Sequence, residues 1–284
     1  MFTITLRSIT IACLVTVAWV AGVYQLFDLL VNFETQWYWY PLALLYTVTI
    51  NEYFGHLCCG HKMFKIDTSR ITYKILVFLN CVDHAWGPPT SMALIHQNHH
   101  MYADQGIQDL SNPKLQSWYG PGILSPIHYI YQWTGWEISN KKNYFATQRI
   151  AFDHIVTDKW TQFCEENSHW LTIFYWTVLY LIFPIFLFKI VLLSRLLISF
   201  YTLFPGHLGH MKIPGGYRNF NTNDTSYNNL IFHYLCLCIF PTVLQNNHHG
   251  MKYTFDQGNC HRFFEFDLSV YPMRLIRFLI KKNT

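Results

Sequence analysis

Histidine is concentrated in four short segments of this chain. Of the fifteen histidines in 284 residues, nine fall into these clusters and the intervening stretches hold few. The clusters are His56-Leu-Cys-Cys-Gly-His61, His96-Gln-Asn-His99-His100, His207-Leu-Gly-His210 and Gln245-Asn-Asn-His248-His249. Neutral imidazole is well suited to binding iron, copper or zinc at physiological pH. The clustering therefore predicts a metal centre.

The spacing within the clusters places several rings on one helix face. His96, His99 and His100 stand at i, i+3 and i+4, so their side chains lie on one face of an α-helix. Such a face could bind two ions at once. The segment that begins at Gln245 repeats this spacing. His56 and His61 are five residues apart, about 140° around an α-helix, so we expect the helix to loosen before His61.

The number of clustered histidines favours two ions over one. Zinc sites are typically four-coordinate, and eight or more histidines exceed what a single ion needs. Nitrogen ligands with few carboxylates suit iron or copper in redox chemistry, and two adjacent irons can activate O2. Five histidines outside the clusters are interpreted as ordinary polar residues, and His84 is ambiguous: the five are His128, His154, His169, His233 and His261.

The composition indicates a membrane protein. Apolar residues make up 51% of the chain, aromatic residues 18% and charged residues only 13%, about half the charged fraction of an ordinary soluble protein. A transmembrane helix needs about 20 apolar residues. The apolar runs predict transmembrane helices at about 9–31, 37–55, 169–187 and 189–207, although the first run could instead be a secretory signal peptide.

The positions of Lys and Arg predict the orientation of these helices. Nearly all of the twenty lie within 62–159 and 212–282. By the positive-inside rule, the segments 56–168 and 208–284 and both termini would face the cytoplasm. We therefore expect an all-α integral, multi-pass membrane protein, a single domain over 1–284, with four transmembrane helices and a cytosolic helical cap that holds a di-metal centre. No nucleic-acid motif or basic stripe is present in the sequence, so nucleic-acid binding is not expected.

The cluster sequences, with three further segments, resemble the membrane fatty acid desaturases, specifically the acyl-CoA or acyl-lipid Δ9 type. The three further segments are His99-His-Met-Tyr-Ala-Asp104 with Asp109-Leu-Ser-Asn-Pro113, Gly216-Tyr-Arg-Asn-Phe-Asn-Thr-Asn-Asp224, and Phe264-Glu-Phe-Asp267. Together with the histidine clusters they cover roughly residues 40 to 275.

The resemblance implies a reaction, a cofactor and a set of ligands. Such an enzyme uses O2 and two electrons to place a cis double bond in an acyl chain at a di-iron centre. The implied iron ligands are His56, His61, His96, His99, His100, His210, His248 and His249, and Asp104 would fix a histidine ring. Implied partners are a fatty acyl substrate carried on CoA, acyl carrier protein or lipid, an electron donor such as ferredoxin or cytochrome b5, and membrane lipid. The implied location is the bacterial inner membrane or the endoplasmic reticulum.

Two positions depart from the family pattern. Gln245 stands where the Δ9 type has histidine, and it could bind a metal through its carbonyl oxygen or through water, or leave a coordination site open. His207 competes with His210 for the single histidine that the family places after its fourth helix. Two rival functions remain open: a related di-iron hydroxylase or ketolase, and a metal-transport or metal-binding protein.

Overall fold

A computed structural model describes the parts of the chain that surround the histidine clusters. The described residues are Val17, Tyr24, Asp28, 40–61, 64–83, 89–105, Asp109, Ile155, 158–182, 208–251 and 261–282. These residues are mostly helical, with one two-stranded sheet. The expectation of a predominantly helical chain is met within them.

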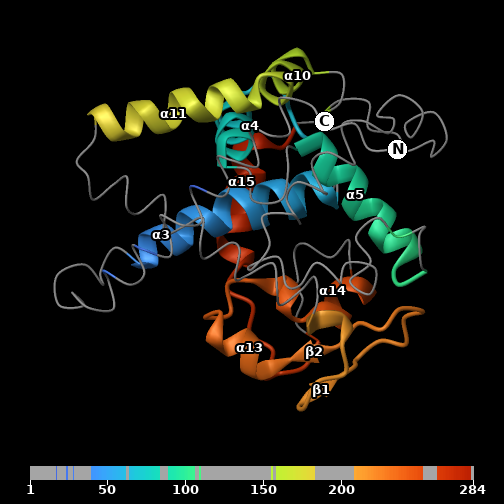
Figure 1. Cartoon of the computed structure of the whole chain (residues 1–284). Coiled ribbons are helices and arrows are strands. Elements are labelled where there is room, and N and C mark those ends of the chain that lie inside the picture. The colour runs from blue at the N-terminus through green and yellow to red at the C-terminus, as the bar shows by residue number, and fades with distance from the viewer. Residues whose placement is uncertain are drawn as a thin grey trace, which may run out of the picture.

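A central helix organises the first half of the molecule. Tyr40–Thr47 (α3) continues into Val48–Gly60 (η2), which is wound as a π-helix and crosses the centre of Figure 1 in blue. Ile71–Asp83 (α4) and Pro89–Tyr102 (α5) both pack against η2. Their shared apolar core includes Phe54, which lies against the Tyr73 ring with centroids 6.0 Å apart. The core is thus built around the helix that carries the first histidine cluster.

Three further helices cover this core. Lys159–Glu166 (α10) is capped at its N-terminus by Asp158, whose carboxylate accepts a hydrogen bond from the Thr161 backbone N–H. Ser168–Ile182 (α11) follows and packs with α10 against α4, in yellow at the top of Figure 1. Val270–Ile280 (α15) contacts both η2 and α4. The chain's last described helix therefore returns to the first half of the molecule.

The region 208–251 is built from much shorter elements, drawn in orange in Figure 1. These are Leu208–His210 (η5), Gly216–Tyr217 (β1), Asn228–Asn229 (β2), Leu230–Leu235 (α13), Pro241–Val243 (η6) and Gln245–Gly250 (α14). β1 and β2 are antiparallel, with Gly216 opposite Asn229 and Tyr217 opposite Asn228. Elements of this length bury little apolar surface, so side-chain hydrogen bonds must hold them together.

The predicted membrane architecture was wrong. Among the described residues, none of the helices combines the length and the apolar character needed to traverse a bilayer. The predicted helix 37–55 corresponds to α3 and η2, where Asn51 and Glu52 point into the protein and bond to Asp83, His56 and Thr242. The η2 part of this segment is buried in the protein core, whereas Leu42 and Leu45 of α3 are exposed.

Of the other three predicted spans, only one falls largely within the described residues. The predicted helix 169–187 corresponds to α11, a 15-residue helix that ends at Ile182 within the described part. The predicted helices 9–31 and 189–207 lie almost entirely outside the described residues. The predicted integral, multi-pass localisation and its topology are overturned by the finding that no described helix could cross a bilayer.

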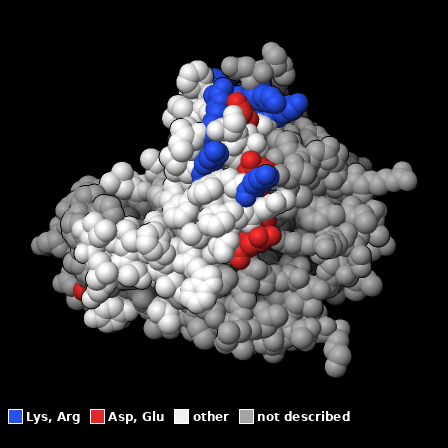
Figure 2. Space-filling view, turned by 90° about the horizontal axis from the view of Figure 1, so that it is seen from above, with Lys and Arg blue, Asp and Glu red and all other residues white. Residues whose placement is uncertain are grey.

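Charged side chains of both signs lie close together on the described surface. Figure 2 shows Lys and Arg side chains beside Asp and Glu side chains in one strip of that face, with uncharged residues over most of the remainder. This described face therefore presents no extended surface of a single charge.

Candidate metal centre

Seven buried histidines converge in two adjacent groups. His56, His61, His96 and His248 form the first histidine group, and His99, His210 and His249 form the second histidine group. Within each group, one nitrogen from every ring lies within 4.8 Å of the others. Each group draws its rings from separate elements of the fold. The two groups could hold metal ions.

The π winding of η2 explains how His56 and His61 reach one site. In a π-helix the backbone bonds run from residue i to i+5, and the His61 N–H donates to the His56 carbonyl at 3.1 Å. The two imidazoles therefore fall on the same side, with centroids 5.0 Å apart. We expected the helix to loosen locally before His61, and the structure extends that change over the whole segment from Val48 to Gly60.

A glycine admits the ring from α5. A Cβ placed on Gly60 would lie 3.3 Å from Cδ2 of His96, so a larger residue would crowd that ring. His96 Nε2 lies 2.8 Å from His56 Nε2 and 2.7 Å from His61 Nε2. Ligands at right angles around an ion with metal–nitrogen bonds of about 2.1 Å would be separated by about 3.0 Å. The third separation, between His56 Nε2 and His61 Nε2, is 3.3 Å, so the three observed values lie on both sides of the one expected around an ion.

The second histidine group joins α5, η5 and α14. The ring centroids of His99, His210 and His249 lie 4.9 to 5.0 Å from one another. The Gln245 side-chain amide lies against this group, with Nε2 3.2 Å from His210 Nε2 and 3.0 Å from His249 Nε2. Its Oε1 is buried and has no hydrogen-bond partner among the residues that the structure describes. If the amide were turned by 180°, this oxygen would face the two imidazole nitrogens.

His100 lies between the two groups. Its Nε2 is 2.8 Å from His96 Nε2 and 3.1 Å from His248 Nε2, both in the first histidine group. Its ring centroid is 4.5 Å from that of His249, in the second histidine group. His100 is therefore in contact with rings of both groups.

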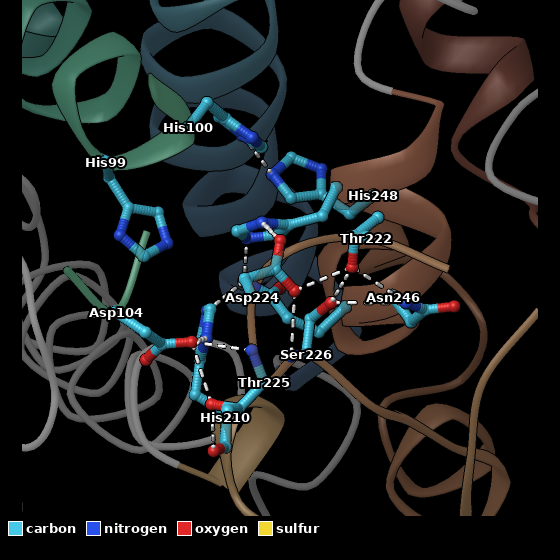
Figure 3. Close-up of polar contacts among 12 residues, drawn as sticks. His99, His100, Asp104, His210, Thr222, Asp224, Thr225, Ser226, Asn246 and His248 are labelled. Atoms are coloured by element: carbon cyan, nitrogen blue, oxygen red, sulfur yellow. Dashed lines mark hydrogen bonds and ion pairs between the residues drawn. The ribbon is translucent and has the colours of Figure 1, made fainter. Parts of the chain in front are cut away.

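Four carboxylates accept hydrogen bonds from the outer nitrogens of these rings. Glu52 accepts from His56 Nδ1 at 2.9 Å in the first histidine group. In the second histidine group, Asp109 accepts from His99, Asp104 from His210 and Asp224 from His249, at 3.1, 3.3 and 2.8 Å respectively. Figure 3 shows Asp104 with His210 and Thr225, and Asp224 with Thr222 and Ser226. The second histidine group thus has a carboxylate behind each of its three rings.

These carboxylates fix the tautomers of the rings that they contact. An ionised carboxylate only accepts hydrogen bonds, so each paired Nδ1 carries the proton and the neutral ring keeps a lone pair on Nε2. The Nε2 atoms are the ones that converge. Lone pairs brought this close repel one another unless a proton or a metal cation lies among them. This donor set therefore fits a metal ion.

Burial keeps the converging rings neutral. Burial, and after it the neighbouring His56 and His61 rings, lower the pKa of His96 well below its usual value. Burial likewise lowers the pKa of His248 and of His100. Burial lowers the pKa of His249 to about 3, although its hydrogen bond to Asp224 opposes the shift. At neutral pH these rings are therefore unprotonated, which is the state that binds metal.

Two of the carboxylates remain ionised in spite of their burial. Burial alone would raise the pKa of Asp104, but hydrogen bonds from His210 and Thr225 hold that pKa well below its usual range. Asp224 behaves in the same way, with His249 and Ser226 as its donors. Buried anions beside neutral rings need positive charge nearby. A bound cation would supply it.

A network of amide side chains holds α14, which carries two of the histidines. Asn246 Oδ1 accepts from the backbone N–H groups of Asn219 and Phe220, at 2.7 and 2.8 Å. Asn247 Oδ1 accepts from the side-chain amides of Asn219 and Asn228, and its Nδ2 donates to Glu265 at 2.9 Å. The two asparagines between Gln245 and His248 thus anchor a helix of only six residues.

The structure brings together nearly all the residues singled out by the sequence. The eight implied ligands lie in or between the two groups, and Asp104 contacts the His210 ring as expected. His207 lies outside the described residues. His233 bonds to the Phe266 carbonyl, and His261 is exposed.

Sequence reasoning missed three of the four carboxylates. Asp109 and Asp224 lie in segments that carried the family resemblance, but no role was assigned to them. Glu52 stands four residues before His56, a spacing that brings two side chains together on a helix. That spacing was the one local signal available for Glu52.

Comparison with known proteins places this chain in no family. Neither a protein-family model nor a curated protein matches the chain. What the structure itself supplies is a pair of histidine groups that could hold metal.

Proposed function

We propose that this protein is an O2-dependent fatty acyl desaturase that holds two iron ions in its two histidine groups. The observation that carries the proposal is the convergence of seven buried histidines into two adjacent groups, with His100 between them. The cluster sequences and their resemblance to the desaturases give the proposal its reaction type. Nitrogen-rich sites of this kind suit iron in redox chemistry.

The proposed ligands divide between the two ions. His56, His61, His96 and His248 would hold one ion, and His99, His210 and His249 would hold the other. His100 would complete one of the two sites, and Gln245 and His207 are additional candidate ligands. Bound iron would supply the activation of O2 and the removal of hydrogen from an unreactive carbon.

The chain's own side chains prepare this site. Glu52, Asp104, Asp109 and Asp224 hold the outer protons of four rings and direct the opposite nitrogens inward. Burial excludes water from the rings and keeps them unprotonated. Both effects favour tight metal binding in a dry site.

The reaction consumes O2, two electrons and two protons, removes two hydrogens from the acyl chain, and releases two water molecules. The proposed product carries a cis double bond in a Δ9-like position. The acyl group would arrive on CoA, acyl carrier protein or a lipid. A ferredoxin or a cytochrome b5-like protein would deliver the electrons.

The test is turnover by the iron-loaded protein. We would reconstitute it with ferrous iron, supply a reduced ferredoxin or cytochrome b5 and stearoyl-CoA, and analyse the fatty acids by mass spectrometry. The expected product is the substrate less two hydrogens. His248→Ala should lose the product and bound iron together, whereas His261→Ala, at an exposed histidine outside the groups, should retain both.

Other outcomes would replace the proposal. A product that has gained one oxygen atom would identify a hydroxylase. Bound iron without O2 consumption, across CoA, acyl-carrier and lipid-linked substrates, would identify a metal-binding protein. Failure to bind iron at all would remove the basis of the proposal.

A further inference from the structure

The two histidine groups differ in the negative charge behind their rings. In the second histidine group every ring has its own carboxylate: Asp109, Asp104 and Asp224. In the first histidine group Glu52 stands behind His56. Within the described part of the chain, neither His96 nor His248 bonds to a carboxylate. The polar contacts of these two rings are with other histidine rings.

A carboxylate behind an imidazole makes that imidazole a stronger electron donor. The hydrogen bond draws the Nδ1 proton toward the carboxylate, which raises the basicity of the opposite nitrogen. A more basic ligand set, with more negative charge nearby, stabilises the ferric ion more than the ferrous ion. Three such carboxylates lie close to the second histidine group, and they are 0%, 7% and 9% exposed. At such burial, solvent screens their charges little.

Gln245 increases the difference between the groups. The first histidine group offers four imidazoles, whereas the second histidine group offers three and the Gln245 amide. In the described part of the chain no group bonds to the buried Gln245 Oε1 atom, so no hydrogen bond at that atom opposes a turn of the amide. Turned toward His210 and His249, this oxygen would give the second histidine group a harder donor, which again favours the ferric ion.

We propose that the two ions are electronically unequal, and that the ion in the second histidine group has the lower reduction potential. Electrons from the donor then reduce the ion in the first histidine group before the ion in the second histidine group. This inference rests on the proposed function only in that both groups hold iron. It assigns each group a separate place in the order of electron uptake.

The experiment is a redox titration of the iron-loaded protein followed by Mössbauer and electron paramagnetic resonance spectroscopy. The wild-type protein should show two potentials and a half-reduced state that contains one ferric and one ferrous ion. Asp104→Asn removes one charge behind the second histidine group. Asn is well suited to this position because Asp104 has a left-handed backbone, with φ of 64°. Glu52→Gln is the matched change at the first histidine group.

Each variant should move one potential. Asp104→Asn should raise the lower potential, and a tenfold loss in the preference for ferric over ferrous iron corresponds to about 59 mV. Glu52→Gln should raise the upper potential and leave the lower one in place. Asp224→Asn provides a second test at the second histidine group should Asp104→Asn fold poorly.

A third variant tests the amide. Gln245→Leu retains an uncharged side chain of similar size but lacks the oxygen, so it should also raise the lower potential. A single potential for both ions would overturn the inference, and so would a shift of the upper potential in Asp104→Asn. Two potentials that respond as described, in a protein that desaturates none of the acyl substrates, would uphold this inference and reject the proposed reaction. Absence of bound iron would reject both.

Discussion

The two halves of the molecule hold their histidines by opposite means. In the half built from η2, α4 and α5, long helices pack through apolar side chains such as Phe54, Leu57 and Val77. In the region 208–251, elements of two to six residues are joined through polar side chains such as Asn246 and Asn247, which bond to neighbouring loops and to Glu265. Apolar packing tolerates changes of shape, whereas a buried hydrogen-bond network depends on every member.

Acidification should produce the largest effect, because it acts on the rings that the two halves share. The pKa values of His96, His100 and His248 are lowered well below normal in the folded protein, and that of His249 falls to about 3. Below about pH 6.5 the unfolded chain takes up protons on these residues and the folded chain does not. The free energy of unfolding therefore has its full value above this pH. It falls as the pH drops toward the pKa values that these histidines have in the folded protein.

The acid effect can be measured by urea denaturation of chelator-treated protein. Each of the four rings contributes about 1.4 kcal/mol per pH unit, so the loss between about pH 6.5 and pH 5.5 should be several kcal/mol. His261→Ala, at an exposed ring, should show the same pH slope as the wild-type protein. A flat profile over this range would contradict the prediction.

Asn247→Leu should have the next largest effect, in the region held by hydrogen bonds. The change keeps the side-chain volume but removes three buried hydrogen bonds, one each with Asn219, Asn228 and Glu265. Asn219 and Glu265 still bond to each other, whereas Asn228 Nδ2 loses the partner that it has in this network. A neutral hydrogen bond contributes about 1 kcal/mol and a bond to a carboxylate about 1.5–3 kcal/mol, so we expect a loss of about 3 kcal/mol or more. Metal affinity should fall with it, because Asn247 holds the helix that carries His248 and His249. Urea denaturation and a metal titration would measure the two losses.

Leu57→Met should have the smallest effect, in the half held by apolar packing. Leu57 is buried in the core, and exchange of Leu for Met conserves volume, so the cost should stay below about 1.5 kcal/mol. The same denaturation experiment provides the comparison. A cost equal to that of Asn247→Leu would show that the two halves do not differ in the way described.

The sequence predicted which histidines come together better than it predicted the fold. The i, i+3, i+4 spacing of His96, His99 and His100 places the three rings on the side of α5 that faces the other histidines, and this relation is local to a single helix. The carboxylates were harder to anticipate: Asp224 reaches His249 through a loop, and no local pattern specifies that contact. The sequence therefore indicates fewer carboxylates around the histidines than the structure places there.

The membrane prediction failed for a related reason. The run before His56 is apolar, but Asn51 and Glu52 within it are buried and bonded to other parts of the protein. Hydropathy measures how apolar a segment is, and a helix at the centre of a protein core can be as apolar as one in lipid. What surrounds the helix is decided by partners elsewhere in the chain.

The π winding of η2 also bears on how this protein can change over generations. Because the bond between His61 and His56 spans five residues, the number of residues between the two rings sets their relative direction. Many exchanges of one amino acid for another would leave that count intact. The insertion or loss of a single residue between them would turn His61 by about 80° relative to His56, since a π-helix has about 4.4 residues per turn. In this stretch of the gene, length is therefore more tightly constrained than composition.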